Sequence, residues 1–330
     1  MKKCIKQSSF RIFWILLISI PVLLTSCATS IRFPVERPAE IDSKGATSIA
    51  VLPFSSGNMR RFYYNHNSDS KAIANYIQEQ FQQRILRSGF FSLVSAQGLS
   101  SNSRATSPSC DLYIHGAIYN FSNKVEKILL QSEDKKKKQY LFKRKATLSV
   151  RYEVVHTETN EILYSTTQHI EEESAEYASP REVPDFFSLV SSDLRSRITT
   201  ITRKLMPYTT TRRIALLKNK SKKPEIKEAM DTALQLAKEG LYSLAQTAFM
   251  NIYEQQGLFE AGYNAACLLE ATGELEAAEQ LMSQLLFTTN NKKAAKALKE
   301  IQQEIRYAQR LNYQRKAREA ATQKTKASEK

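Results

Sequence analysis

The side chain with the most distinctive chemistry in this sequence is the thiol of Cys27, a nucleophile that can carry a thioether-linked lipid. The small residues Thr25 and Ser26 precede it and leave room for a peptidase to reach the main chain. Further upstream lie four basic residues within the first eleven and an apolar run, Phe13–Leu24. This run is shorter than the ~20 residues that span a bilayer. A basic region, a short apolar region and small residues before a cleavage point are typical of a secretory signal peptide.

The ending Leu24-Thr25-Ser26-Cys27 resembles a bacterial lipobox. The resemblance implies recognition of Leu24, Thr25 and Ser26 by a signal peptidase, lipidation of Cys27 by fatty acids such as palmitate, and a mature protein that starts at Cys27. Because two or more acyl chains anchor a protein stably, the folded part would stay in water while the lipid holds it at a membrane. Ala28 follows the cysteine where an aspartate would change the sorting, which by analogy with Gram-negative lipoproteins favours the outer membrane, facing the periplasm. The alternative is an ordinary signal peptide followed by a chance cysteine.

The other reactive side chains form no recognisable catalytic or metal-binding pattern. Cys110 and Cys267 are far apart, so they are two buried thiols or, in an oxidising compartment, a disulfide. The sequence has four scattered histidines, no CxxC pair and no metal-ligand spacing. It also lacks a nucleophile elbow, a phosphate-binding loop and a dinucleotide fingerprint. The sequence therefore predicts a protein that is not an enzyme and that has no cofactor and no metal.

The charge of the chain is unusually positive for a globular protein. Its 330 residues suggest two domains, and its formal net charge is +15. The segment 291–330 alone holds 12 lysines and arginines against four glutamates. Such a tail can contact anionic lipid or an anionic cell-wall polymer, or it can be a solvated basic tail, helical or disordered. Export across a membrane makes nucleic acid an unexpected partner.

The elements between residues 47 and 207 predict an α+β domain, with an antiparallel or mixed sheet and packed helices. Leu148, Val150, Tyr152 and Val154 alternate with polar residues, as in a half-buried antiparallel strand. The segment before this domain, 27–46, has no periodicity and is expected to be a lipidated tether. The remaining strands are predicted at 47–54, 90–94, 111–121 and 161–168, and the two helices at about 70–88 and 185–205.

Several of these segments resemble a known family. The runs Ile49–Phe54, Arg87–Val94 and Asp111–Gly116, in this order, are similar to the periplasmic domain of curli-secretion-channel (CsgG-like) lipoproteins. Lipoprotein activators of penicillin-binding proteins share that general domain. The resemblance covers roughly 47–207 and implies the same α+β fold. Eight lysines and arginines between Val125 and Leu148 argue against lipid-facing hairpins, and hence against a pore.

The C-terminal part repeats itself with a shift of 33 residues. Gly240–Ala245 aligns with Gly273–Ala278, and Ala233 aligns with Ala266. This pattern resembles the tetratricopeptide repeat, whose period is about 34 residues and whose paired helices need small residues where they approach closely. The resemblance implies two helical hairpins over 224–305, with the helix around 294–305 as a cap or the start of a third.

Arrays of this type bind peptides or partner helices in a concave groove. The alternative is an array that only packs on the first domain or mediates self-association. Asn264 is the residue of most interest, because an amide there can hydrogen-bond a peptide backbone. By the family pattern the groove would be lined by Lys227, Met230, Leu234, Tyr263, Asn264, Cys267 and Glu270.

The predicted organisation has six parts: a signal peptide (1–26), a lipidated tether (27–46), the α+β domain (47–207), a basic linker (208–223), the repeats (224–305) and a basic tail (306–330). It favours a lipid-anchored, non-enzymatic adaptor of the cell envelope, which binds a protein partner through the repeats and the α+β domain. Two alternatives remain, a subunit of a CsgG-like secretion assembly and a lipoprotein activator of a cell-wall synthase.

Overall fold

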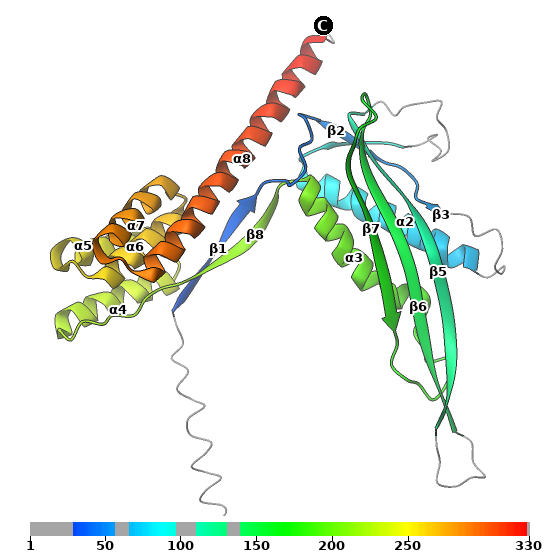
Figure 1. The fold of residues 1–330 in the computed structure, drawn as a ribbon, viewed down its shortest axis with the longest axis horizontal. Coiled ribbons are helices and arrows are strands. Elements are labelled where there is room, and N and C mark those ends of the chain that lie inside the picture. The colour runs from blue at the N-terminus through cyan, green and yellow to red at the C-terminus, as the bar shows by residue number, and fades with distance from the viewer. Residues whose placement is uncertain (1–28, 57–65, 97–109, 131–138, 329–330) are drawn as a thin grey trace, which may run out of the picture. The chain divides into compact units, whose positions relative to one another are not determined.

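A computed structural model of the chain describes residues 29–56, 66–96, 110–130 and 139–328 (Figure 1). Two compact units are present. Of the described residues, the α+β unit comprises those within Glu36–Thr210 and Arg306–Ser328, and the repeat unit comprises Thr29–Val35 and Thr211–Ile305. The architecture is the predicted one, a mixed α+β fold followed by helical hairpins.

The α+β unit is organised around a mixed sheet with the strand order β4-β2-β5-β6-β7. The short β2 pairs in parallel with β4 and β5, whereas β5, β6 and β7 form an antiparallel meander; β3 pairs with β5. The strands are β2 (Ser48–Val51), β3 (Ser55–Ser56), β4 (Ser92–Val94), β5 (Leu112–Leu130), β6 (Gln139–His156) and β7 (Ile162–Glu173). The strands β5 and β6 continue well beyond the segments predicted from the sequence, since polar residues there hide the periodicity.

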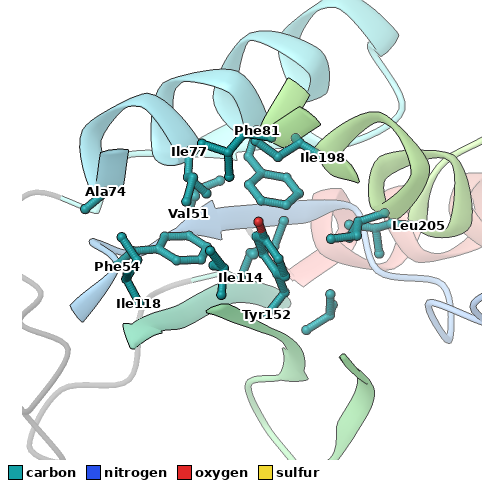
Figure 2. Close-up of a cluster of buried hydrophobic side chains, with 14 of the residues drawn as sticks. Val51, Phe54, Ala74, Ile77, Phe81, Ile114, Ile118, Tyr152, Ile198 and Leu205 are labelled. Atoms are coloured by element: carbon teal, nitrogen blue, oxygen red, sulfur yellow. The ribbon is translucent and has the colours of Figure 1, made fainter. Parts of the chain in front are cut away.

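Two helices, α2 (His66–Ser88) and α3 (Phe186–Leu205), cover one face of this sheet (Figure 1). The predicted burial of one side of β6 is confirmed, because Leu148, Val150, Tyr152 and Val154 are all fully buried. Figure 2 shows the ring of Tyr152 between the sheet and Phe81 of α2. The predicted start of α3 is also confirmed: the Asp185 carboxylate caps the helix by accepting from Ser188 N at 2.8 Å.

The helical part of the repeat unit consists of two helical hairpins and the start of a long helix. In both hairpins the turn contains a glycine with positive φ, +81° at Gly240 and +90° at Gly273, which an L side chain rarely adopts. The aligned alanines Ala233, Ala245, Ala266 and Ala278 are fully buried, as close helix packing requires. The helices are α4 (Pro224–Lys238), α5 (Tyr242–Gln256), α6 (Phe259–Thr272), α7 (Leu275–Thr289) and α8 (Lys292–Ser328).

Two segments expected to lack regular structure contain strands. The expected tether holds β1 (Ser30–Arg37), and the expected linker holds β8 (Tyr208–Ala215); the two strands pair with each other. Within the repeat unit this pairing is supported by hydrogen bonds from Leu216 N to Thr29 O and from Arg213 to Ser30. The basic tail, expected to be helical or disordered, is helical through Ser328.

The lipobox residues Leu24, Thr25, Ser26 and Cys27 lie outside the described residues, so their predicted roles remain predictions. Among the residues that are described, none of the helices combines the length and the apolar character needed to cross a membrane.

Candidate functional site

The residues predicted to line a partner groove lie on α4 and α6 of the repeat unit, and most of them are inaccessible. Met230, Leu234, Asn264, Cys267 and Glu270 are buried, with exposed fractions of 0 to 6%. Tyr263 is half-buried beside Phe259, and only Lys227 is exposed. The described residues of α6 therefore do not form a groove that is open to a partner.

The face of α6 is occupied by a segment of the same chain, residues 211–217, which we call the exit segment. The side-chain amide of Asn264 makes two hydrogen bonds to the main chain of the exit segment. Its Oδ1 accepts from Leu217 N at 2.7 Å, and its Nδ2 donates to Leu217 O at 2.8 Å. Asn264 is fully buried. The amide thus does bind a peptide backbone, as its position suggested, and this backbone belongs to the chain itself.

A second polar contact holds the exit segment at Arg212, five residues before Leu217. Arg212 lies among three carboxylates, with N···O distances of 2.5 Å to Glu270, 3.3 Å to Glu300 and 3.4 Å to Glu304. The side chains of Arg212 and Glu270 are 16% and 4% exposed, so the pair is largely removed from water. Removing one partner would leave a buried charge uncompensated, which is costly.

The titration of this cluster follows from burial and charge. Burial raises the pKa of Glu270, and the neighbouring Arg212 opposes that rise. Burial works against the charged form of Arg212, but the carboxylates of Glu270, Glu304 and Glu300 outweigh it and the pKa of Arg212 is raised. The raised pKa values of Arg212 and Glu270 together mean that Arg212 stays charged beside carboxylates that are poorly solvated.

Apolar contacts complete the seat of the exit segment. The side chains of Ile31 and Phe33 in β1, and of Ile214 and Leu216 around β8, are buried in the same core as Met230 and Leu234 of α4. The ribbon of β1 and β8 therefore contributes a packed layer to the repeat unit. Lys227 lies elsewhere, on the rim of a shallow cleft of about 550 Å³ that also involves Glu228, Asp231 and Leu236.

Arg212 and Leu217 lie in the segment that the sequence predicts to be a basic linker, so neither is among the predicted site residues. One signal was available: the run Tyr-Thr-Thr-Thr at 208–211 is rich in residues that favour strands. Nothing in the sequence indicated where such a strand would pack.

Two further kinds of site, metal-ligand groups and cysteine thiols, can be checked in the described part of the chain. None of its His, Cys, Asp and Glu side chains form a group of three or more that could hold a metal ion. Cys110 and Cys267 are free and buried. Burial raises the pKa of both thiols, so neither is a reactive thiolate at neutral pH.

No family model matches this sequence, and no curated protein is significantly similar to it. Among solved structures, the chain is similar to the PelC dodecamer from Paraburkholderia phytofirmans, with 13% identity, a TM-score of 0.30, and coverage of 54% of this chain and 98% of that chain. It is also similar to the hypothetical protein CT253 from Chlamydia trachomatis (12% identity, TM-score 0.29, coverage 48% and 95%). A third is the lipoprotein GNA1162 from Neisseria meningitidis (13% identity, TM-score 0.25, coverage 48% and 97%). Values this low do not establish a shared fold, and the proposals below rest on the chain's own residues.

Proposed function

We propose that this protein is a lipid-anchored, non-enzymatic adaptor of the bacterial cell envelope, which holds a protein partner through its helical repeats. In this proposal the thiol of Cys27 carries the lipid and the α+β unit, CsgG-like in its element order, adds a second recognition or self-association surface. The hairpins act as tetratricopeptide-like units that bind an extended segment of the partner.

The observation that carries the proposal is the way in which Asn264 holds Leu217. Both hydrogen bonds go to main-chain atoms, so they require an extended backbone and no particular side chain. Glu270 adds a seat for an arginine five residues before the bound main chain, here Arg212. A partner segment with an arginine at that spacing has the same chemistry as the exit segment and can replace it.

If a partner segment replaces the exit segment on α6, two substitutions should change partner recovery in opposite directions. Asn264→Ala removes the groups that hold either segment, so partner recovery falls. Leu217→Pro removes only the donor of the chain's own segment and leaves Asn264 intact, so partner recovery rises. Asn251→Ala, an exposed amide on α5, serves as the matched control.

The experiment is in-cell crosslinking of the full-length protein, followed by purification and quantitative identification of what is recovered. A different envelope protein, decreased with Asn264→Ala, increased with Leu217→Pro and unchanged with Asn251→Ala, supports the adaptor. Recovery of this chain alone in a large ring favours a secretion assembly. Recovery that none of the three substitutions changes refutes binding at this face.

The anchor is tested separately, by growth with a labelled fatty acid. The wild type and Cys4→Ala should be labelled and found in the membrane fraction, whereas Cys27→Ala should be unlabelled. Labelling that persists in Cys27→Ala, or that is absent from the wild type, contradicts lipidation at this residue.

A further inference from the structure

A cleft lined by arginines lies in the α+β unit, where α2 ends at Ser88. It has two lobes, of about 430 and 620 Å³, which share Glu36, Ser88 and Pro207. We call it the arginine cleft. Three arginines line the smaller lobe and two line the larger one: Arg84, Arg87 and Arg203, then Arg315 and Arg318.

The smaller lobe carries positive charge that no carboxylate neutralises. Within the described residues, no acidic side chain lies within ion-pair distance of Arg84, Arg87 or Arg203. Glu36, the one acidic side chain among those that line this lobe, is already engaged: Arg315 donates to both of its oxygens at 2.8 Å. Arg84, Arg87 and Arg203, the last with its guanidinium over the ring of Tyr208, therefore line one hollow without a carboxylate of their own among the described residues.

Two of the five arginines that line the cleft also have a buried N–H donor without an acceptor among the described residues. Four buried side-chain polar atoms lack a hydrogen-bond partner in the part of the chain that the structure describes, and Nε of Arg84 and Nε of Arg318 are two of them. Buried polar groups normally find a partner, so an orphaned one marks strain, a function or a missing ligand. Both atoms belong to side chains that line the same cleft.

The electrostatics of Arg84 agree with this picture. Burial lowers its pKa, Tyr76 opposes the change, and Arg195, Arg87 and Arg203 lower the pKa further by repulsion. Tyr76 in turn accepts a hydrogen bond from Arg195 Nε at 3.2 Å. The group is thus held among like charges, which an anion in the cleft would relieve.

We propose that the arginine cleft binds a phosphate group, with Arg84 and Arg203 as its main ligands. The planar guanidinium presents paired N–H donors that match the oxygens of a phosphate, and such bonds are stronger than neutral ones. The hydroxyl groups nearby compete little, because Thr199 and Thr202 donate to carbonyls of their own helix. Recognition therefore rests on charge and on guanidinium geometry.

The phosphate can come from the headgroup of an anionic phospholipid or from a soluble phosphate ester or polymer. Both sources offer the same oxygens to the arginines, and they differ in whether the ligand lies in a bilayer. The arginines of the cleft and the exit segment belong to different units of the chain.

The test uses the full-length protein in nanodiscs of phosphatidylcholine, titrated calorimetrically with inorganic tripolyphosphate. We expect saturable binding that weakens at least tenfold in Arg84→Gln/Arg203→Gln. The matched control is Arg181→Gln/Arg213→Gln, which removes the same charge from exposed side chains at other places and should bind like the wild type. Repeating the titration in nanodiscs with phosphatidylglycerol separates the sources.

Each result decides a point. Competition by phosphatidylglycerol assigns the site to a headgroup, and unchanged affinity assigns it to a soluble phosphate. Equal weakening in the two double variants shows that only overall charge matters, and it overturns the proposal. The absence of saturable binding, together with an affinity for phosphatidylglycerol nanodiscs that Arg84→Gln/Arg203→Gln leaves unchanged, also overturns it. Circular dichroism of each variant verifies that it is folded.

Discussion

Asn264 and Gln314 carry out the same task in two regions of the molecule with very different exposure to water. In the repeat unit, Asn264 binds the main chain of Leu217. In the α+β unit, Gln314 Nε2 donates to Ala39 O at 2.9 Å, and its Oε1 accepts from Ala39 N at 3.0 Å. Asn264 is fully buried, whereas Gln314 on the tail helix α8 is half-buried.

An arginine–glutamate contact accompanies each amide. Arg212 and Glu270 are 16% and 4% exposed, while Arg315 and Glu36 are 53% and 48% exposed. Water replaces a lost hydrogen bond at an exposed site and cannot do so at a buried one. The same pair of contacts should therefore stabilise structure strongly at the exit segment and weakly at the tail.

The largest expected effect is that of Arg212→Ala. It leaves Glu270 buried without the cation beside it, and breaking a buried ion pair in this way costs about 3–5 kcal/mol. The free energy of unfolding of the repeat unit, measured by hydrogen exchange of its helices, reports the loss. Arg213→Ala, an exposed neighbour that loses one hydrogen bond to Ser30, should change it by no more than about 1 kcal/mol. Equal effects of the two substitutions would refute the buried cluster.

Asn264→Ala should have the second largest effect. It leaves the N–H and C=O of Leu217 without partners in a buried place, at a cost of about 1–3 kcal/mol. The most direct measurement is amide exchange of Leu217, which should accelerate about ten- to a hundredfold. The exposed control Asn251→Ala should leave this exchange unchanged. A similar acceleration in both variants would mean that helix propensity, and not the amide, is responsible.

The effect of Arg212→Ala should also depend on pH. Burial raises the pKa of Glu270 in the folded protein above its value in the unfolded chain. The stability that comes from this difference is fully present below the unfolded pKa, and it is lost as the pH rises through the folded pKa. Without the cation of Arg212 the carboxyl remains protonated to higher pH. The loss caused by Arg212→Ala should therefore be smaller at pH 5 than at pH 7, by on the order of 1 kcal/mol. A loss that is the same at both pH values, measured by thermal unfolding, would contradict this.

The difference between the two regions also shows what the sequence could reveal. The α+β order, the alternation of β6 and the two helical hairpins follow from local periodicity, since each element repeats its own apolar spacing. The sequence indicates Asn264 as a residue able to bind a backbone, because the 33-residue shift predicts that its helix is one of a repeated pair. Its actual ligand, Leu217, was assigned to a linker, because nothing local distinguishes a segment that packs on a distant helix from one in solvent.

The arginine cleft was hidden for the same reason. Arg84, Arg203 and Arg318 come from three helices and are separated by more than a hundred residues from one to the next. Each alone resembles an ordinary solvated arginine, and only the fold brings them to the end of α2. The sequence did indicate a surplus of positive charge in the tail, but it could not indicate that two of those arginines line a cleft.

Gln314→Ala tests the weaker side of the comparison. The loss of two partly exposed hydrogen bonds should cost about 0.5–1 kcal/mol, because water reaches the main chain of Ala39 once the side chain is gone. Exchange of the Ala39 amide should accelerate by no more than about fivefold. The neighbouring exposed residue Asn312 provides the control, as Asn312→Ala. A cost equal to that of Asn264→Ala would show that burial is not what separates the two amides.

Arg315→Ala should have the smallest effect on stability, within about 0–1 kcal/mol, because exposed ion pairs contribute little and are screened by salt. Raising the ionic strength should therefore reduce the difference in melting temperature between Arg315→Ala and the wild type, while the difference for Arg212→Ala persists. The substitution also releases Glu36 into the arginine cleft, where its carboxylate can compete with an anion for Arg84 and Arg203. Arg315→Ala should accordingly weaken tripolyphosphate binding more than it changes stability. A variant that binds as the wild type does would show that Glu36 does not control access to those arginines.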